Sequence, residues 1–264
     1  MTYEVYAIKY AEQTERVRGN NYMFEDNHDA PDPIDFYMWL IRGEGRVILV
    51  DTGFDAAEGQ ARGRPIRLDP GEALKPFGLQ PDDVTEIIVT HLHFDHAGGL
   101  HLFPNAQLHL QVAEMAYATG PCMCHDVLRD PFTVGHVVEA VQRLYSGKVT
   151  FHDGDSEIAE GITVHRVGGH TKGLQAVRVR TQAGRLVLAS DAAHFYGNFL
   201  TGTPFPIVVD MQDMLDGFAT IQRLASARKL VVPGHDPLVR QYFPTAMADH
   251  ITRLDVGPIQ DPTQ

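Results

Sequence analysis

The stretch Thr90-His91-Leu92-His93-Phe94-Asp95-His96-Ala97-Gly98-Gly99 places four side chains that can bind a metal within six residues. It follows the apolar, β-branched run 86–90 and enters a glycine-rich turn. A regular strand would alternate these side chains across its two faces, whereas a turn at the strand end lets them converge. Three histidines and an aspartate in this arrangement therefore predict a metal site.

Three more potential ligands follow apolar runs farther along the chain, where α/β proteins place polar groups that rigid strands position. They are His170 in Gly168-Gly-His-Thr171, Asp191 in Leu188-Ala-Ser-Asp191 and His235 in Pro233-Gly-His-Asp236. Together with the first four they make seven ligands, which is enough for two metal ions.

Strand-like and helix-like segments alternate along the chain. Apolar, β-branched runs predict strands at 37–41, 46–50, 86–90, 106–110, 162–166, 176–180, 185–189 and 229–232. Helical periodicity predicts helices at 70–77, 112–117, 135–145, 211–225 and 245–254. No linker or repeat divides the sequence, so we predict an α/β fold in a single domain spanning residues 1–264.

The composition argues against nucleic acid as a partner and against a membrane protein. The 22 Lys and Arg residues against 34 Asp and Glu residues give a net charge of −12, which repels a polyanion. No apolar run approaches the roughly 18 residues needed to span a bilayer, and the first residues lack a signal-peptide pattern. Cys122 and Cys124 lie too close together to join distant segments. We therefore expect a cytoplasmic protein.

The ordered set of motifs resembles the metallo-β-lactamase superfamily. The likeness runs from about Val47 to Asp236. It includes Asp51 in Leu49-Val-Asp-Thr-Gly53, which matches a strand-end aspartate that typically supports the metals from outside the ligand set. The resemblance implies an αββα sandwich, two mixed sheets flanked by helices, with the metals at one edge of the sheets.

Carried over by position, the resemblance implies a dinuclear centre. The first ion would be held by His91, His93 and His170, the second by Asp95, His96 and His235, and Asp191 would bridge both. An imidazole-rich site favours two Zn²⁺ ions, with Mn, Fe or Co as alternatives. Water between the ions would become hydroxide near neutral pH and attack a polarised carbonyl, and Asp95 would pass a proton to the leaving group.

Ligand identity separates branches of the superfamily. His93 stands where the di-iron oxidoreductase branch commonly has Glu, and Asp191 stands where the best-known zinc β-lactamases have Cys. Both differences favour a hydrolase that does not degrade antibiotics. Hydrolysis of another ester, a thioester or an amide, a di-iron redox protein and a non-catalytic metal-binding module remain as alternatives.

Three local sequences resemble the N-acyl homoserine lactonase group, which opens a lactone ring: 91–99, Gly169-His-Thr-Lys-Gly173 and Ser190-Asp-Ala-Ala193. We therefore expect a small-molecule lactone or ester as substrate. These lactonases commonly carry Tyr three residues after the bridging aspartate, whereas this chain has His194 there. We expect His194 to contact the substrate. Tyr196 is a second candidate for the missing hydroxyl, and its alternative is a role in core packing.

Segments outside the motifs are expected to shape the pocket. Residues 115–145, with two prolines and several aromatics, predict an inserted helical lid beside the metals. The loops 19–33 and 196–206 are rich in Pro, Gly and Asn and would form pocket walls, the alternative being that their aromatic residues only pin them to the core. The first of these loops could equally contact a second subunit, since related lactonases are often homodimers.

Other Cys and His residues lack the spacing of a metal site. Cys122-Met-Cys-His125 has one residue between its cysteines, where tetrahedral zinc sites typically have about two to four. The remaining histidines, His109 and His152 among them, are scattered. We interpret all of these as ordinary surface or core residues.

Overall fold

The computed structural model describes residues 1–263, and its largest element there is a mixed sheet of eight strands. Their order across the sheet is β12-β13-β1-β2-β3-β4-β5-β6. The strands from β12 to β3 pair antiparallel, whereas β3 to β6 pair parallel. The bounds are β1 Glu4–Gln13, β2 Ile34–Gly43, β3 Arg46–Val50, β4 Glu86–Ile88, β5 Gln107–Gln111, β6 Val149–His152, β12 Thr245–Ala246 and β13 Ala248–Arg253.

A second sheet packs face to face against the first. Within the described residues it has five strands in the order β11-β10-β9-β8-β7, and β10 and β11 are its parallel pair. The bounds are β7 Ser156–Ala159, β8 Ile162–Arg166, β9 Gln175–Thr181, β10 Gly184–Ser190 and β11 Val231–Pro233.

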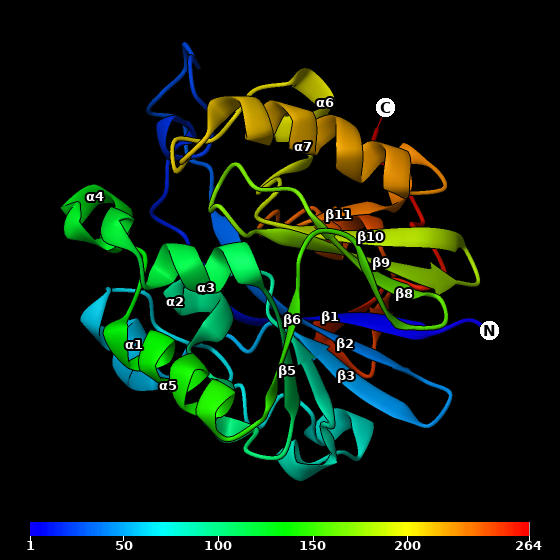
Figure 1. Cartoon of the computed structure of the whole chain (residues 1–264). Coiled ribbons are helices and arrows are strands. Elements are labelled where there is room, and N and C mark those ends of the chain that lie inside the picture. The colour runs from blue at the N-terminus through cyan, green and yellow to red at the C-terminus, as the bar shows by residue number, and fades with distance from the viewer. Residues whose placement is uncertain (264) are drawn as a thin grey trace.

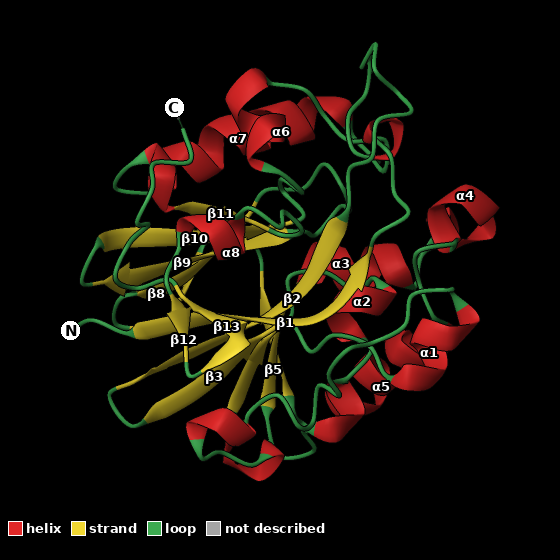
Figure 2. Cartoon of the chain, turned by 180° about the vertical axis from the view of Figure 1, so that it is seen from behind, coloured by secondary structure: helices red, strands yellow, loops and turns green. Residues whose placement is uncertain are grey.

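Helices cover the outer faces of both sheets. Figure 1 shows α6 and α7 over the small sheet and α1, α2, α3 and α5 beside the large one, and Figure 2 shows the same layers from behind. The predicted αββα sandwich is therefore confirmed. Across residues 1–263, no helix combines the length and apolarity that a membrane crossing requires.

The α-helices are α1 Ala56–Ala61, α2 Phe94–Ala97, α3 Val112–Ala118, α4 Asp126–Arg129, α5 Val134–Tyr145, α6 Tyr196–Thr201, α7 Met211–Leu224 and α8 Val239–Tyr242. Short 3₁₀ helices are η1 Arg18–Asn20, η2 Lys75–Phe77, η3 Pro81–Asp83, η4 Leu100–Leu102, η5 Pro121–Cys124 and η6 Arg228–Leu230.

The two cores follow from side-chain alternation along the strands. On β2, one face contributes to a core shared with the small sheet: Tyr37, Trp39 and Ile41. The other face contributes to a core under the outer helices: Phe36, Met38 and Leu40. Because both faces of β2 are covered, the strand reads as a continuous apolar run.

The last and first segments of the large sheet differ from the sequence-based expectation. Residues 245–254 were expected to be helical but form β12 and β13, because Ile251 pairs with Ile8 of β1. The strand β1 itself was missed. In the expected helix 70–77 the regular structure is the 3₁₀ turn η2. Each of the eight predicted strands overlaps an observed strand.

The parallel strands end at one edge of the sandwich, and that edge carries the predicted ligands. Ser190 of β10 pairs with Pro233 of β11, so the residues that follow both strands are neighbours. A Cβ on Gly234 would lie 2.8 Å from Asp191 Oδ1 and from the backbone of Ser190. Position 234 therefore needs glycine for the two strand ends to approach so closely.

Candidate metal centre

Loops at this edge bring all seven predicted ligands together. Together with His194, these residues form four groups, and inside each group the metal-binding atoms lie within 4.8 Å of one another: His91–His93–His170, His91–His96–Asp191, Asp95–His96–His235 and His170–Asp191–His194. The free cysteines Cys122 and Cys124 lie outside these groups. Residues up to 144 positions apart in the sequence, from His91 to His235, thus meet in one cluster.

Asp191 lies between two sets of histidines, one facing each of its oxygens. Its Oδ1 is 3.3 Å from His96 Nε2 and 3.1 Å from His235 Nε2. Its Oδ2 is 3.3 Å from His170 Nε2 and 3.8 Å from His91 Nε2. A carboxylate so placed can give one oxygen to each of two ions, which lie about 3.5–4 Å apart in dinuclear sites.

Protein acceptors hold the outer ring nitrogens of three of these histidines. His96 Nδ1 lies 2.8 Å from Asp51 Oδ2, His170 Nδ1 lies 2.7 Å from the Ile207 carbonyl, and His235 Nδ1 lies 2.9 Å from the Asp35 carbonyl. Such contacts fix the tautomer in which Nδ1 carries the proton, so that Nε2 offers a lone pair to the cluster.

The inner nitrogens lack ordinary partners. Among the described residues, His91 Nε2 and His96 Nε2 are buried and form no hydrogen bond. His93 Nδ1 lies 2.9 Å from His170 Nε2, so two ring nitrogens face each other. Buried nitrogens without partners are costly, and a cation between converging lone pairs removes that cost. The donor set therefore fits a metal centre.

Burial keeps three of the imidazoles neutral. It lowers the pKa of His91 and His93 well below the usual value and also lowers that of His170. Neutral imidazole is the form that binds a metal ion. These side chains are thus already in the ligating state at pH 7.

His96 differs because three carboxylates surround it. Burial alone would lower the pKa of His96, but Asp191, Asp95 and Asp51 raise it well above the usual value. Burial likewise opposes ionisation of Asp191, yet the neighbouring histidines hold its pKa well below the usual range. A carboxylate that stays ionised in a buried site, as Asp191 does, creates a demand for positive charge.

Asp51 supports the cluster from behind His96. Besides the His96 ring, its carboxylate accepts hydrogen bonds from Thr90 N at 2.7 Å and Thr90 Oγ1 at 2.8 Å. Thr90 Oγ1 also lies 2.9 Å from Ser190 Oγ. Asp51 and Ser190 both adopt left-handed backbone conformations, with φ of 59° and 47°. Non-glycine residues rarely do so, and this hydrogen-bond network holds them there.

Glu114 is a supporting residue that the sequence analysis missed. It is fully buried on α3 and accepts hydrogen bonds from Leu92 N at 2.9 Å, Thr171 Oγ1 at 2.6 Å and Gly173 N at 3.0 Å. It therefore ties the 91–93 loop to the loop that carries His170. Burial raises the pKa of Glu114 to about 7, against the effect of these donors. No spacing pattern in the sequence distinguishes it from a surface glutamate.

His194 lies inside the cluster. Its Nε2 is 2.9 Å from Asp191 Oδ2, and its ring stacks on Phe205 at a centroid distance of 3.5 Å. Burial lowers the pKa of His194 to about 3, so it is neutral at pH 7. The side chain lines the same cavity as Asp95 and His235.

Tyr196 is not among the residues that line the cavity at the cluster, and a contact of its hydroxyl with substrate stays a prediction. It begins α6, and its ring packs against Phe199 and Tyr242 at centroid distances of 6.0 Å and 5.5 Å. It lines a separate cavity of about 680 Å³ next to the 19–33 loop. Its side chain is part of the core shared by the two sheets.

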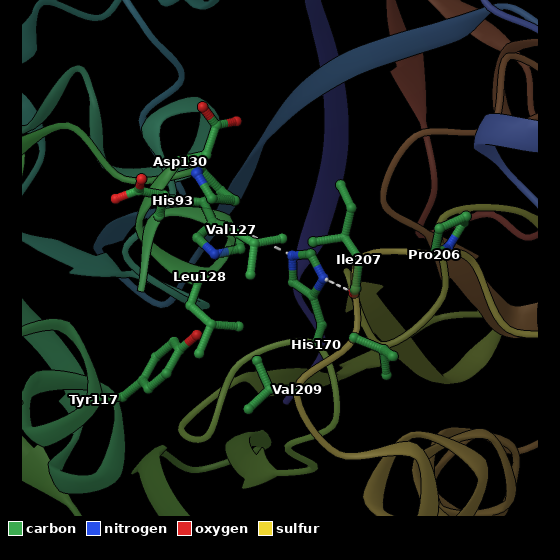
Figure 3. A pocket seen from close by; sticks show the side chains of 12 residues that line it. His93, Tyr117, Val127, Leu128, Asp130, His170, Pro206, Ile207 and Val209 are labelled. Atoms are coloured by element: carbon green, nitrogen blue, oxygen red, sulfur yellow. Dashed lines mark hydrogen bonds between the residues drawn. The ribbon is translucent and has the colours of Figure 1, made fainter. Parts of the chain in front are cut away.

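A largely apolar cavity of about 460 Å³ opens beside His93 and His170 (Figure 3). Its walls come from two segments, 117–131 and 206–209. In Figure 3 Tyr117, Val127 and Leu128 stand on one side of His170 and Ile207 and Pro206 on the other. Helix α5, also within the expected lid, instead buries Val137 and Ala140 in the core under the outer helices.

Comparisons with known proteins agree with this geometry. The family model described as the metallo-beta-lactamase superfamily matches residues 37–241. An N-acyl homoserine lactonase from Bacillus cereus is 29% identical over 216 residues, covering 76% of this chain and 80% of that protein. An N-acyl homoserine lactonase from a Bacillus species is 28% identical over 221 residues, covering 77% and 82%.

Solved structures share the fold. An N-acyl homoserine lactone hydrolase with its product bound at the catalytic metal centre superposes with a TM-score of 0.73 at 23% identity, covering 90% of this chain and 95% of that one. A dizinc quorum-quenching lactonase superposes with a TM-score of 0.64 at 20% identity, covering 88% and 86%. The family match, together with the αββα layers and the histidine–aspartate cluster at the sheet edge, shows that the chain belongs to the metallo-β-lactamase superfamily.

Proposed function

We propose that this chain is a dinuclear metal-dependent hydrolase that opens lactone rings. Relatives named N-acyl homoserine lactonase, 28–29% identical over about three quarters of the chain, support the reaction class. The observation that carries the proposal is Asp191, whose two oxygens face two different sets of imidazoles. This arrangement matches a carboxylate shared by two ions.

The proposed ligand sets follow the two oxygens of Asp191. His91, His93 and His170 would hold one ion, Asp95, His96 and His235 the other, and Asp191 both. We propose Zn²⁺ because imidazole nitrogen suits it, with Mn, Fe or Co as substitutes. Bound divalent ions supply a water nucleophile that is ionised near neutral pH and polarise the substrate carbonyl.

Asp95 is the proposed proton carrier. Its Oδ2 lies 3.6 Å from His96 Nε2 and 3.7 Å from His235 Nε2, and its side chain is 11% exposed in the cavity. A water molecule adds to the ring carbonyl, the bond from the acyl carbon to the ring oxygen breaks, and that oxygen leaves as an alcohol. Asp95 takes up the proton released on attack and returns it to this oxygen.

His194 is proposed as a positioning residue with access to substrate. Its Nε2 holds Asp191 Oδ2, and its ring reaches the cavity in which the substrate would lie. A neutral His194 can hold the carboxylate without changing charge as the reaction proceeds. A His194→Phe variant whose pH–rate profile matches the parent in rate and shape would remove this role.

The substrate's apolar part is proposed to lie in the 460 Å³ cavity beside His93 and His170. Residues from 117 to 131, within the proposed lid at 115–145, line this cavity, and their apolar members Val127 and Leu128 suit an acyl or alkyl group. Acyl-chain length would then be selected between this lid and the 206–209 segment.

A panel of substrates tests the proposal. Metal-replete protein would be assayed with N-acyl homoserine lactones, plain and carboxylate-bearing γ-lactones, aryl esters and thioesters, with a chelated sample as control. We expect lactone opening that chelation abolishes and Zn²⁺ restores. If every lactone reacts at less than about a hundredth of the rate of another ester or thioester, lactone opening is rejected in favour of that substrate.

A further inference from the structure

Three arginines line the small cavity of about 70 Å³ at the metal cluster, and nothing in the hydrolysis outlined above uses them. Arg16 follows β1, whereas Arg62 and Arg64 follow α1. The same cavity is lined by Asp95, His194 and other members of the cluster. A substrate whose ester bond lies at the cluster would therefore contact these guanidinium groups.

Arg62 has a structural explanation. Its Nε donates to Glu58 Oε1 at 2.5 Å, and its terminal nitrogens donate to the carbonyls of Asp130 at 2.9 Å and Phe132 at 3.2 Å. These bonds tie α1 to the 130–133 segment. Arg62 thus has a carboxylate partner and a role in holding the lid segment.

Arg16 and Arg64 differ from Arg62 in lacking a carboxylate partner among the described residues. In the described part of the chain, neither forms an ion pair, whereas Arg62 and Arg67 from the same loop both do. Arg16 donates to Asn21 Oδ1 at 2.5 Å and to the Asn20 carbonyl at 3.0 Å. The Nε of Arg64 is buried without a hydrogen-bond partner, and its guanidinium lies 5.0 Å from the ring centre of Phe94.

The two arginines line the same small cavity, so the charge of each affects the other. Burial and the neighbouring charge of Arg64 lower the pKa of Arg16 to about 10, although Asp95, Asp32 and Asp191 partly oppose this. Asp95 and Asp191 are proposed metal ligands, and Asp32 accepts a hydrogen bond from Asn21 Nδ2 at 2.9 Å. Two like charges in a half-buried cavity are costly unless an anion lies between them.

We propose that the natural substrate carries a carboxylate in addition to its lactone or ester group, and that Arg16 and Arg64 bind this carboxylate while the scissile carbonyl lies at the metal cluster. Guanidinium groups recognise carboxylates through paired, charge-assisted hydrogen bonds. The carboxylate takes no part in bond breaking. This inference rests on the proposed hydrolase function and narrows its substrate class.

A matched pair of substrates tests it. A γ-lactone with a carboxylate on the ring would be compared with its carboxamide, which has the same shape without the charge. For the metal-replete parent we expect kcat/KM to be about tenfold to a hundredfold higher for the carboxylate, the size of a charge-assisted contact. Arg64→Gln and Arg16→Gln should remove this preference, and Arg16→Lys should keep part of it.

Arg67→Gln is the control variant. Arg67 lies in the same loop, its side chain is 64% exposed, and it pairs with Glu12 at 2.9 Å outside the cavity. This variant should keep the preference of the parent. Equal kcat/KM for the two lactones in the parent, or an equal loss on both substrates in the arginine variants, would overturn the inference and leave lactone hydrolysis standing.

Calorimetric titration provides a second measurement that needs no turnover. Zinc-loaded protein would be titrated with glutarate, which has two carboxylates, and with butyrate, which has one. We expect glutarate to bind at least about tenfold more tightly, and Arg64→Gln to abolish the difference. If no lactone or ester is hydrolysed, the proposed function fails, and this titration still decides the arginine site: equal affinities would reject it.

Discussion

Two sets of buried histidines in this molecule differ in what surrounds them. The first set is the cluster at the sheet edge. The second is His109 on β5 and His152 on β6, whose rings stack at a centroid distance of 5.3 Å, with His109 Nδ1 lying 3.0 Å from His152 Nε2. Both sets are buried and close-packed, so burial and proximity alone do not distinguish a metal centre.

What surrounds the ring nitrogens does distinguish the cluster from the His109–His152 pair. In the pair, one ring nitrogen of each histidine faces the other, and Glu86 Oε1, which lies 3.5 Å from the outer nitrogen of His109, is a carboxylate at the rim of the pair rather than between its rings. In the cluster, protein acceptors hold the outer nitrogens, the inner nitrogens converge, and Asp191 stands between them. Imidazoles oriented from outside around a shared carboxylate are arranged for a cation.

The largest effect is expected from Asp191→Asn. An amide has one oxygen and no negative charge, so it cannot give an anionic oxygen to each of the two proposed ions. Because an outer partner of a ligand already affects metal binding by about 10–100-fold, we expect this change to lower kcat/KM by about a thousandfold or more. Steady-state kinetics at saturating Zn²⁺ measures it. A loss of less than tenfold would show that Asp191 is not shared.

Glu114→Gln should reveal a pH-dependent contribution to stability. The pKa of Glu114 is raised from 4.5 to about 7, so the folded state holds this proton more tightly than the unfolded chain does. The stability that Glu114 adds is fully present below pH 4.5 and is lost as the pH rises toward 7. Relative to the Gln variant, the parent should lose roughly 3 kcal/mol across this range.

Urea denaturation of the metal-stripped parent and Glu114→Gln proteins between pH 4 and pH 8, roughly spanning the transition, measures this difference. A constant difference across the range would mean that the Glu114 carboxyl titrates near its ordinary pKa.

Asp51→Asn tests the support behind His96. The amide still accepts one hydrogen bond from Thr90 but loses the charge that orients His96. We expect the affinity for Zn²⁺ to fall by about 10–100-fold, with little change in the number of ions bound at saturation. Competition with a zinc chelator measures the affinity, and an unchanged dissociation constant would argue against this role.

The smallest effect is expected from His109→Gln, the control for the comparison. Gln can still hydrogen-bond His152, and we expect a cost in stability of about 1 kcal/mol with no change in zinc content or kcat/KM. Thermal denaturation and metal analysis of the same sample check both parts. A loss of bound zinc would mean that the stacked pair, too, takes part in metal binding.

The parts of the fold that were predictable are those where local pattern and tertiary environment agree. Buried strands such as β2 and β10 read as apolar, β-branched runs. The segment 245–254 has a helix-like pattern, yet pairing with β1 makes it a strand. Neither the pairing partner nor its distance is visible within a short window of sequence, and tertiary pairing overrides local propensity.

The candidate site, like the fold, has one part that the sequence predicts and one part that it does not. The 91–96 motif was visible because its ligands lie close together in the sequence, and the more distant His170, Asp191 and His235 were found because each follows a strand. Glu114, Arg16 and Arg64 gave no signal, since their role depends on which loops α1, α3 and β1 approach. The sequence also does not tell which way the first turn of α6 faces, and so which cavity Tyr196 lines.

The central claim is that seven side chains from both sheets hold two divalent ions around Asp191. The most direct test is the metal content of chelated protein that has been re-equilibrated with Zn²⁺ and freed of excess metal, measured by mass spectrometry. The account predicts two zinc ions per chain in the parent and in His109→Gln. One ion or none in the parent would contradict it.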